Sequence, residues 1–160
     1  MVRIMDLLTS LTGRGKKSLL RKGDSYYKSR EYGRAIQCFK RVLELDPTSE
    51  EAYYGIGTSL NRLGMYDEAI TNFDKALTLN PKSPLTLYRK GNSLFFLARY
   101  DEAIQCYDKA LELDPQFSDV WYNKSTCYRH LGDADKAVLC EEEAEKALGH
   151  SFIGYRILKE

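Results

Sequence analysis

The strongest constraint on the fold is a 34-residue period in the amino-acid sequence. Pro47, Pro81 and Pro115 lie 34 residues apart, and the segments that they close read LELDP, LTLNP and LELDP. A fourth copy continues the register and has Gly149 where the proline would stand. A period of this length indicates stacked copies of one supersecondary unit, each of which buries its apolar face against its neighbours.

Each copy has the pattern of a helical hairpin. In its second half, apolar residues recur at helical spacing, as in Ala69, Ile70, Phe73, Ala76 and Leu77. The proline then ends the second helix, because it disfavours the helical conformation at the residue before it.

Capping residues predict where three of the first helices begin. Ser83 followed by Pro84 fits an N-cap with proline at the first helical position. Thr48 and Glu51 have the spacing of a capping box. Ser118 is predicted to cap the fourth copy.

Small residues recur where paired helices must approach closely. A glycine inside a helix costs about 1 kcal/mol relative to alanine, so its recurrence at one position indicates tight packing there. Two positions of the repeat hold small residues in all four copies. The first is occupied by Gly23, Gly57, Gly91 and Ser125, and the second by Ala35, Ala69, Ala103 and Ala137. Two further positions of the repeat hold large apolar or aromatic residues. The first is occupied by Leu19, Tyr53, Leu87 and Trp121, and the second by Phe39, Phe73 and Tyr107.

The sequence resembles the tetratricopeptide repeat family in its 34-residue period, in the positions of its small and large residues, and in the proline that closes the first three copies. The resemblance covers four copies, at residues 16–49, 50–83, 84–117 and 118–151. It implies an all-α fold, a right-handed superhelical solenoid of four helical hairpins. We expect residues 1–15 to be an N-terminal extension or cap and residues 152–160 a C-terminal capping helix, unless a fifth repeat has been cut there. Glu141 stands where the pattern has an aromatic residue, which suggests a partly exposed last helix.

The resemblance also implies a function, that of a scaffold for protein–protein interaction. In this family the first helix of each hairpin lines a concave groove that binds a peptide or protein. Carried over position by position, the groove of this chain is an aromatic ladder with polar donors beside it, a suitable peptide site. The alternative is that the tyrosines only pack. The predicted binding residues are Tyr54, Tyr88, Asn92, Phe95, Phe96, Tyr122 and Arg129.

One binding mode of the family is not expected. Some members hold the C-terminal carboxylates of chaperone tails with Lys, Asn and Arg side chains. Of the residues at those positions only Arg89 fits, and Asp24 would repel a carboxylate. The positions hold Leu20, Asp24, Gly55, Leu85 and Arg89.

The net charge of +1 excludes a strong overall field, yet charge is uneven along the chain. Residues 16–49 hold nine Lys or Arg and four Asp or Glu, a balance of +5, and residues 118–151 hold four and seven, a balance of −3. The ends could be solvated caps. As the alternative function, they could join copies head to tail into a self-assembling structural module. Nucleic acid binding at the basic end is a weaker hypothesis.

No pattern predicts an enzyme, a cofactor or a metal site. The GRGKKS segment at residues 13–18 lacks the glycine spacing and the hydroxyl residue of a phosphate-binding loop. The four cysteines form no CxxC pair, so reduced structural thiols are expected. With no secretory signal and no apolar run that would span a bilayer, the expected location is cytoplasmic. The cysteines are Cys38, Cys106, Cys127 and Cys140.

Overall fold

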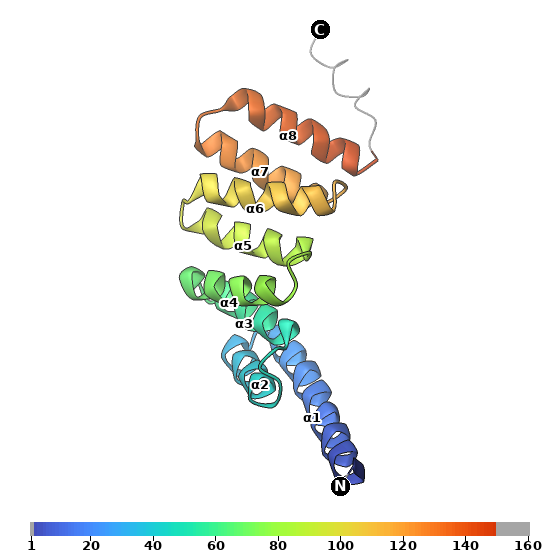
Figure 1. Cartoon of the computed structure of the whole chain (residues 1–160). Coiled ribbons are helices and arrows are strands. Elements are labelled where there is room, and N and C mark those ends of the chain that lie inside the picture. Colours follow the sequence, from blue (N-terminus) through green and yellow to red (C-terminus); the bar gives the residue numbers. More distant parts are fainter. Residues whose placement is uncertain (1, 150–160) are drawn as a thin grey trace. The chain divides into compact units, whose positions relative to one another are not determined.

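The fold is all α-helical, as predicted. The computed structural model describes residues 2–149, with side chains for residues 13–149, and this part holds eight helices and no strand (Figure 1). Short loops join them into four consecutive hairpins, which the repeat predicts. The expected capping helix at residues 152–160 lies outside the described residues. The helices are α1 (Val2–Lys28), α2 (Tyr32–Leu45), α3 (Glu50–Arg62), α4 (Tyr66–Leu79), α5 (Pro84–Phe96), α6 (Tyr100–Leu113), α7 (Ser118–His130) and α8 (Ala134–Ala147).

The chain divides into two compact units, Met1–Pro81 and Lys82–Glu160. Each unit contains two hairpins. In the first unit α2 packs against α3, and in the second α6 packs against α7, so the second helix of one hairpin meets the first helix of the next. Hairpin stacking of this kind is what the 34-residue period requires.

Aromatic rings fill the space that the small residues leave. The ring of Phe39 is buried between Gly23 of α1 and Gly55 of α3, and a Cβ added at either glycine would lie 2.6 Å from it. In the second unit Tyr107 lies on Gly91, where an added Cβ would be 2.4 Å from the ring. Contacts this short leave no room for a side chain, which confirms the predicted close packing.

The fourth hairpin replaces both partners of this contact together. Ser125 stands at the glycine position and Glu141 at the aromatic position, and the Ser125 hydroxyl donates to Glu141 Oε1 at 3.1 Å. A hydrogen bond therefore takes the place of a ring against a backbone. The expectation of a partly exposed last helix agrees with Val138 and Leu139, which are 49% and 58% exposed on α8.

One of the three predicted caps is present. Ser83 caps α5, since its hydroxyl accepts a hydrogen bond from the Thr86 amide at 3.3 Å. The prediction for Thr48 is wrong by one residue: Ser49 caps α3, because Asp46 accepts both donors of Thr48. The prediction for Ser118 is also wrong, because this residue is already the first of α7 and follows Phe117 at the N-cap.

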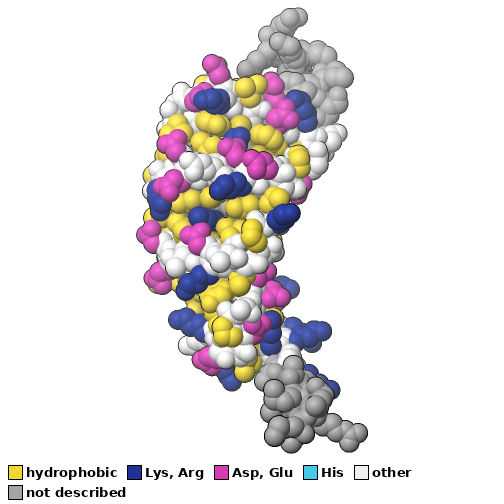
Figure 2. Space-filling view, in the orientation of Figure 1, with side chains coloured by type: hydrophobic (Ala, Val, Ile, Leu, Met, Phe, Trp, Pro, Cys, Tyr) yellow, Lys and Arg dark blue, Asp and Glu magenta, His cyan; other side chains and the backbone are white. Residues whose placement is uncertain are grey.

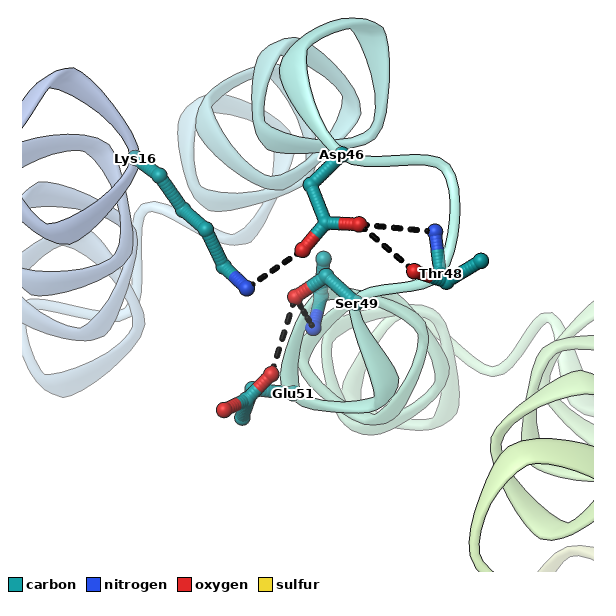
Figure 3. A network of polar contacts seen from close by, with 6 residues as sticks. Lys16, Asp46, Thr48, Ser49 and Glu51 are labelled. Atoms are coloured by element: carbon teal, nitrogen blue, oxygen red, sulfur yellow. Dashed lines mark hydrogen bonds and ion pairs between the residues drawn. The ribbon is translucent and has the colours of Figure 1, made fainter. Parts of the chain in front are cut away.

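A polar network ties α1 to the loop between α2 and α3 (Figure 3). The Lys16 ammonium donates to Asp46 Oδ2 at 2.5 Å, while the other oxygen of this carboxylate accepts from Thr48. These donors lower the pKa of Asp46 from 3.8 to about 2. Ser49 donates to Glu51 at 2.9 Å beside them. The network thus fixes α1, which runs unbroken from the N-terminal extension at residues 2–15 into the first repeat.

Candidate functional site

A cavity opens on the face where α5 and α7 lie side by side in the second unit. Its volume is about 170 Å³. Both helices are first helices of their hairpins, which is where the family resemblance places a groove. Three predicted binding residues line the cavity together with two further ones; its residues are Asn92, Phe95, Phe96, Asn123 and Thr126.

Two asparagine side chains are held in a defined orientation at the wall of this cavity. The Oδ1 atom of Asn92 accepts from the hydroxyl of buried Tyr107 at 2.7 Å and from Asn123 Nδ2 at 2.8 Å. The same Asn123 group lies 3.4 Å from the Tyr88 hydroxyl. Within residues 13–149, no side-chain or backbone partner occupies Asn92 Nδ2 or Asn123 Oδ1. The wall therefore offers one amide donor and one amide acceptor.

The other wall of the cavity is aromatic. The ring of Phe95 makes an edge contact with Phe96, with centroids 5.8 Å apart. It also contacts Tyr100 and His130, which stack on each other at 4.7 Å. Phe96 is 59% exposed although it belongs to this cluster. A large exposed ring that packs against the half-buried ring of Phe95 is a typical anchor for a partner's apolar side chain.

Two predicted tyrosines pack against the protein. Tyr88 lies 5.0 Å from the ring of Phe117 and 6.3 Å from that of Tyr107, so it supports the amide network from below. Tyr54 belongs to the first unit, where it packs against the core and lies 6.1 Å from Phe73. Both rings are half-buried, which leaves an edge of each accessible.

The remaining predicted residues lie on α7. Tyr122 is 39% exposed. The guanidinium of Arg129 pairs with Glu141 at 2.6 Å, and its Nε atom donates to the same oxygen at 3.0 Å. Arg129 is thereby fixed between α7 and α8, with its charge balanced inside the hairpin.

The predicted residues did not include Asn123 or Thr126. The position of Asn123 holds Arg21, Gly55 and Arg89 in the other copies, so no recurring residue type marks it. Its place in the site depends on Tyr107 and Asn92, which come from other helices. Thr126 shares its position with Asn92 in the preceding copy, and this equivalence was the signal that could have found it.

Two of the four cysteine thiols are buried in surroundings that keep them protonated. Burial raises the pKa of the Cys127 thiol to about 12, and Cys140 is shifted upward for the same reason, so neither thiol ionises near neutral pH. No group of three metal-ligating side chains occurs among the described residues. Among the same residues, no helix has the length and apolar character needed to cross a membrane.

Family models decide the identity of the repeat. Models described as tetratricopeptide repeat match residues 20–84, 84–117 and 106–138. The chain belongs to the tetratricopeptide repeat family. These matches follow the hairpins of this tetratricopeptide repeat protein from α1 into α8. A comparison with curated protein sequences gave no match.

Solved structures of the same fold resemble the chain over most of its length. The structure titled "Crystal structure of MamA" is 25% identical, with a TM-score of 0.81, and the match covers 92% of this chain and 86% of that one. MamA from Desulfovibrio magneticus RS-1 is 19% identical, with a TM-score of 0.78 and coverages of 91% and 78%. The first repeat domain of Spaghetti (RPAP3), solved with the HSP90 peptide SRMEEVD, is 24% identical, with a TM-score of 0.72 and coverages of 74% and 94%.

Proposed function

We propose that this protein is a non-enzymatic scaffold that binds an extended peptide segment of a partner protein at the α5–α7 cavity. The observation that carries the proposal is the pairing of the amide wall with the aromatic wall. A peptide bond presents one donor and one acceptor, and the unpartnered groups of Asn92 and Asn123 complement both. An apolar side chain of the same segment would cover Phe96.

The amide wall is suited to binding because its geometry exists before the ligand arrives. Asn92 is oriented by Tyr107, and desolvation in the core raises the pKa of that phenol, which keeps it a neutral donor at every physiological pH. A ligand then has no side-chain freedom to restrain at Asn92, which lowers the entropic cost of binding.

Tyr122 extends the proposed site along α7, and Tyr88 supports it from below. Tyr54 would provide a similar half-exposed ring on the first unit. Arg129 is assigned a supporting part, because its charge is already paired with Glu141. A cytoplasmic partner is the simplest one to propose for a chain with these reduced, buried cysteines.

The chemistry of this site differs from that of a carboxylate clamp. Spaghetti (RPAP3) was solved with the acidic peptide SRMEEVD, whereas the cavity here is lined by uncharged side chains. We therefore propose that this chain binds SRMEEVD poorly and selects segments with an apolar anchor. Weak binding of SRMEEVD together with strong binding of peptides that carry an apolar anchor would distinguish this site from one that binds chaperone tails.

The test starts from a displayed peptide library panned on the purified chain. Affinities of selected peptides are then measured for the parent and for a variant carrying Phe96→Ala and Tyr122→Ala, with SRMEEVD as a comparison. A matched control carries Val138→Ala and Leu139→Ala, which remove exposed apolar groups from α8 instead. We expect the first variant to lose at least about tenfold in affinity and the control to bind as the parent does. Equal loss in both variants, or none in either, would contradict the proposed site.

A further inference from the structure

We propose that this chain stacks head to tail with a second copy of itself, through a basic face of α1 and an acidic face of α8. This interaction uses neither wall of the α5–α7 cavity and does not depend on the proposed peptide binding. Figure 2 shows Lys and Arg side chains around the described part of α1, and Asp and Glu side chains interspersed with Lys and Arg over α7 and α8. The positions that pair at junctions between hairpins predict which residues of the two faces would come into contact.

The head face is the side of α1 that the later hairpins use for stacking. Its residues form a surface hollow of about 500 Å³ and are Arg14, Lys17, Ser18, Arg21, Lys22 and Ser25. At the equivalent positions of α3 and α7, residues such as Ala52, Val120 and Cys127 are fully buried under the preceding hairpin. In the first repeat the same side of the helix is exposed and cationic. It therefore has the geometry of a stacking surface with a charge that selects an acidic helix.

The tail face is the side of α8 that would meet a following hairpin. It consists of Glu141, Glu142 and Glu145, all half-buried. One repeat earlier, the equivalent residues Tyr107 and Leu111 are buried where α6 packs against α7. At positions 141 and 145 the last hairpin thus presents carboxylates where the α6–α7 junction buries Tyr107 and Leu111.

The α6–α7 junction shows which residues would pair. There, Lys124 Nζ lies 2.6 Å from Asp108 Oδ1, and the lysine side chain is only 14% exposed. Moving this contact to the ends of the chain by whole repeats places Glu142 of one copy opposite Lys22 of the next. The same shift turns the contact between Tyr107 and Asn123 into one between Glu141 and Arg21. Ser125 and Arg129 both donate to Oε1 of Glu141, so Oε2 is the atom that would face Arg21. Both pairs join opposite charges.

Lys22 already has the arrangement that Lys124 has in the junction. Its ammonium lies 5.8 Å from the centroid of the Tyr26 ring, and that of Lys124 lies 5.9 Å from the ring of the equivalent Tyr128. A cation held over an aromatic face loses little freedom when a carboxylate arrives. The head face is therefore prepared for an acidic side chain at this position.

The internal α2–α3 junction does not use this charge pair. Lys40 stands at the position of Asp108 and Ile56 at that of Lys124, so the two positions change together. A copy with Lys40 in place of Glu142 would repel the head face. This difference selects the α8 end, and not α2, as the surface complementary to α1.

Sedimentation velocity of the full chain over a wide concentration range, at low and at high salt, tests the proposal. We expect assembly that grows with concentration beyond a dimer, because a heterologous contact leaves one free face at each end. We expect high salt to weaken it, since exposed charges are screened. Lys22→Glu and Glu142→Lys should each weaken association by about tenfold. Lys28→Glu and Glu143→Lys carry the same charge changes on α1 and α8 outside the two faces and should leave it unchanged.

Charge exchange makes the test specific. Mixing the Lys22→Glu variant with the Glu142→Lys variant should restore assembly, because the head of the first then matches the tail of the second. A chain carrying both substitutions should assemble alone. Circular dichroism confirms that each variant is folded. A parent that stays monomeric at every concentration, single variants that assemble like the parent, or a mixture that fails to recover would each overturn the proposal. Binding of a nucleic acid to the head face without self-association would also overturn it.

Discussion

Replacing Gly91 by alanine should destabilise the second unit, although alanine is the better helix former. The change improves intrinsic helix propensity by up to about 1 kcal/mol. It also places a Cβ 2.4 Å from Tyr107 Cε1 and 2.8 Å from Cδ1, where carbon atoms cannot remain. The ring cannot easily move away, since it is fully buried and its hydroxyl donates a hydrogen bond to Asn92. Overpacking of this kind costs about 1–3 kcal/mol.

Because both constraints act on the same ring, we place the overpacking cost near the upper end of that range and expect a net loss of about 2 kcal/mol. The assay is urea unfolding, followed by circular dichroism and by the fluorescence of Trp121 as a reporter in the second unit. Gly33→Ala in α2 is the matched control, because an added Cβ meets nothing within 4 Å there. It should raise stability by about 0.5 kcal/mol. A Gly91→Ala variant as stable as the parent would refute the argument that the ring excludes a side chain.

Three further predictions follow from the same contacts. Asp46 has a folded-state pKa of about 2, below its ordinary 3.8, so its contribution to stability is present above about pH 4 and is lost as the pH falls toward 2. In the Asp46→Asn variant, the free energy of unfolding measured against pH should change less over this range than in the parent. Glu141→Phe alone should lower the melting temperature, because the new ring would collide with the Cβ of Ser125. Adding Ser125→Gly should restore the melting temperature, and a further decrease would contradict this account. Tyr107→Phe should cost about 1 kcal/mol in urea unfolding and weaken selected peptides, with unchanged affinity counting against preorganisation of Asn92.

The repeat pattern predicted the helices well because its signals are local. Proline spacing, apolar periodicity and the small positions depend on neighbours within one hairpin, and α2 through α8 begin and end where this pattern places them within a few residues. The capping predictions were less accurate. A hydroxyl residue near a helix start has several donors within reach, and at Thr48 the carboxylate of Asp46 competed successfully for it.

The sequence by itself determined the fold class and the number of described hairpins, and its resemblance to the family predicted the helix face of the proposed groove. Only the tertiary structure decided which side chains on that face are available. Tyr54 and Tyr88 became partly packed, Arg129 became paired with Glu141, and Asn123 entered the cavity wall. These outcomes depend on residues from other helices, whose approach is set by how rings such as Tyr107 fit against the next hairpin. Sequence spacing describes one helix at a time, so it cannot encode that fit.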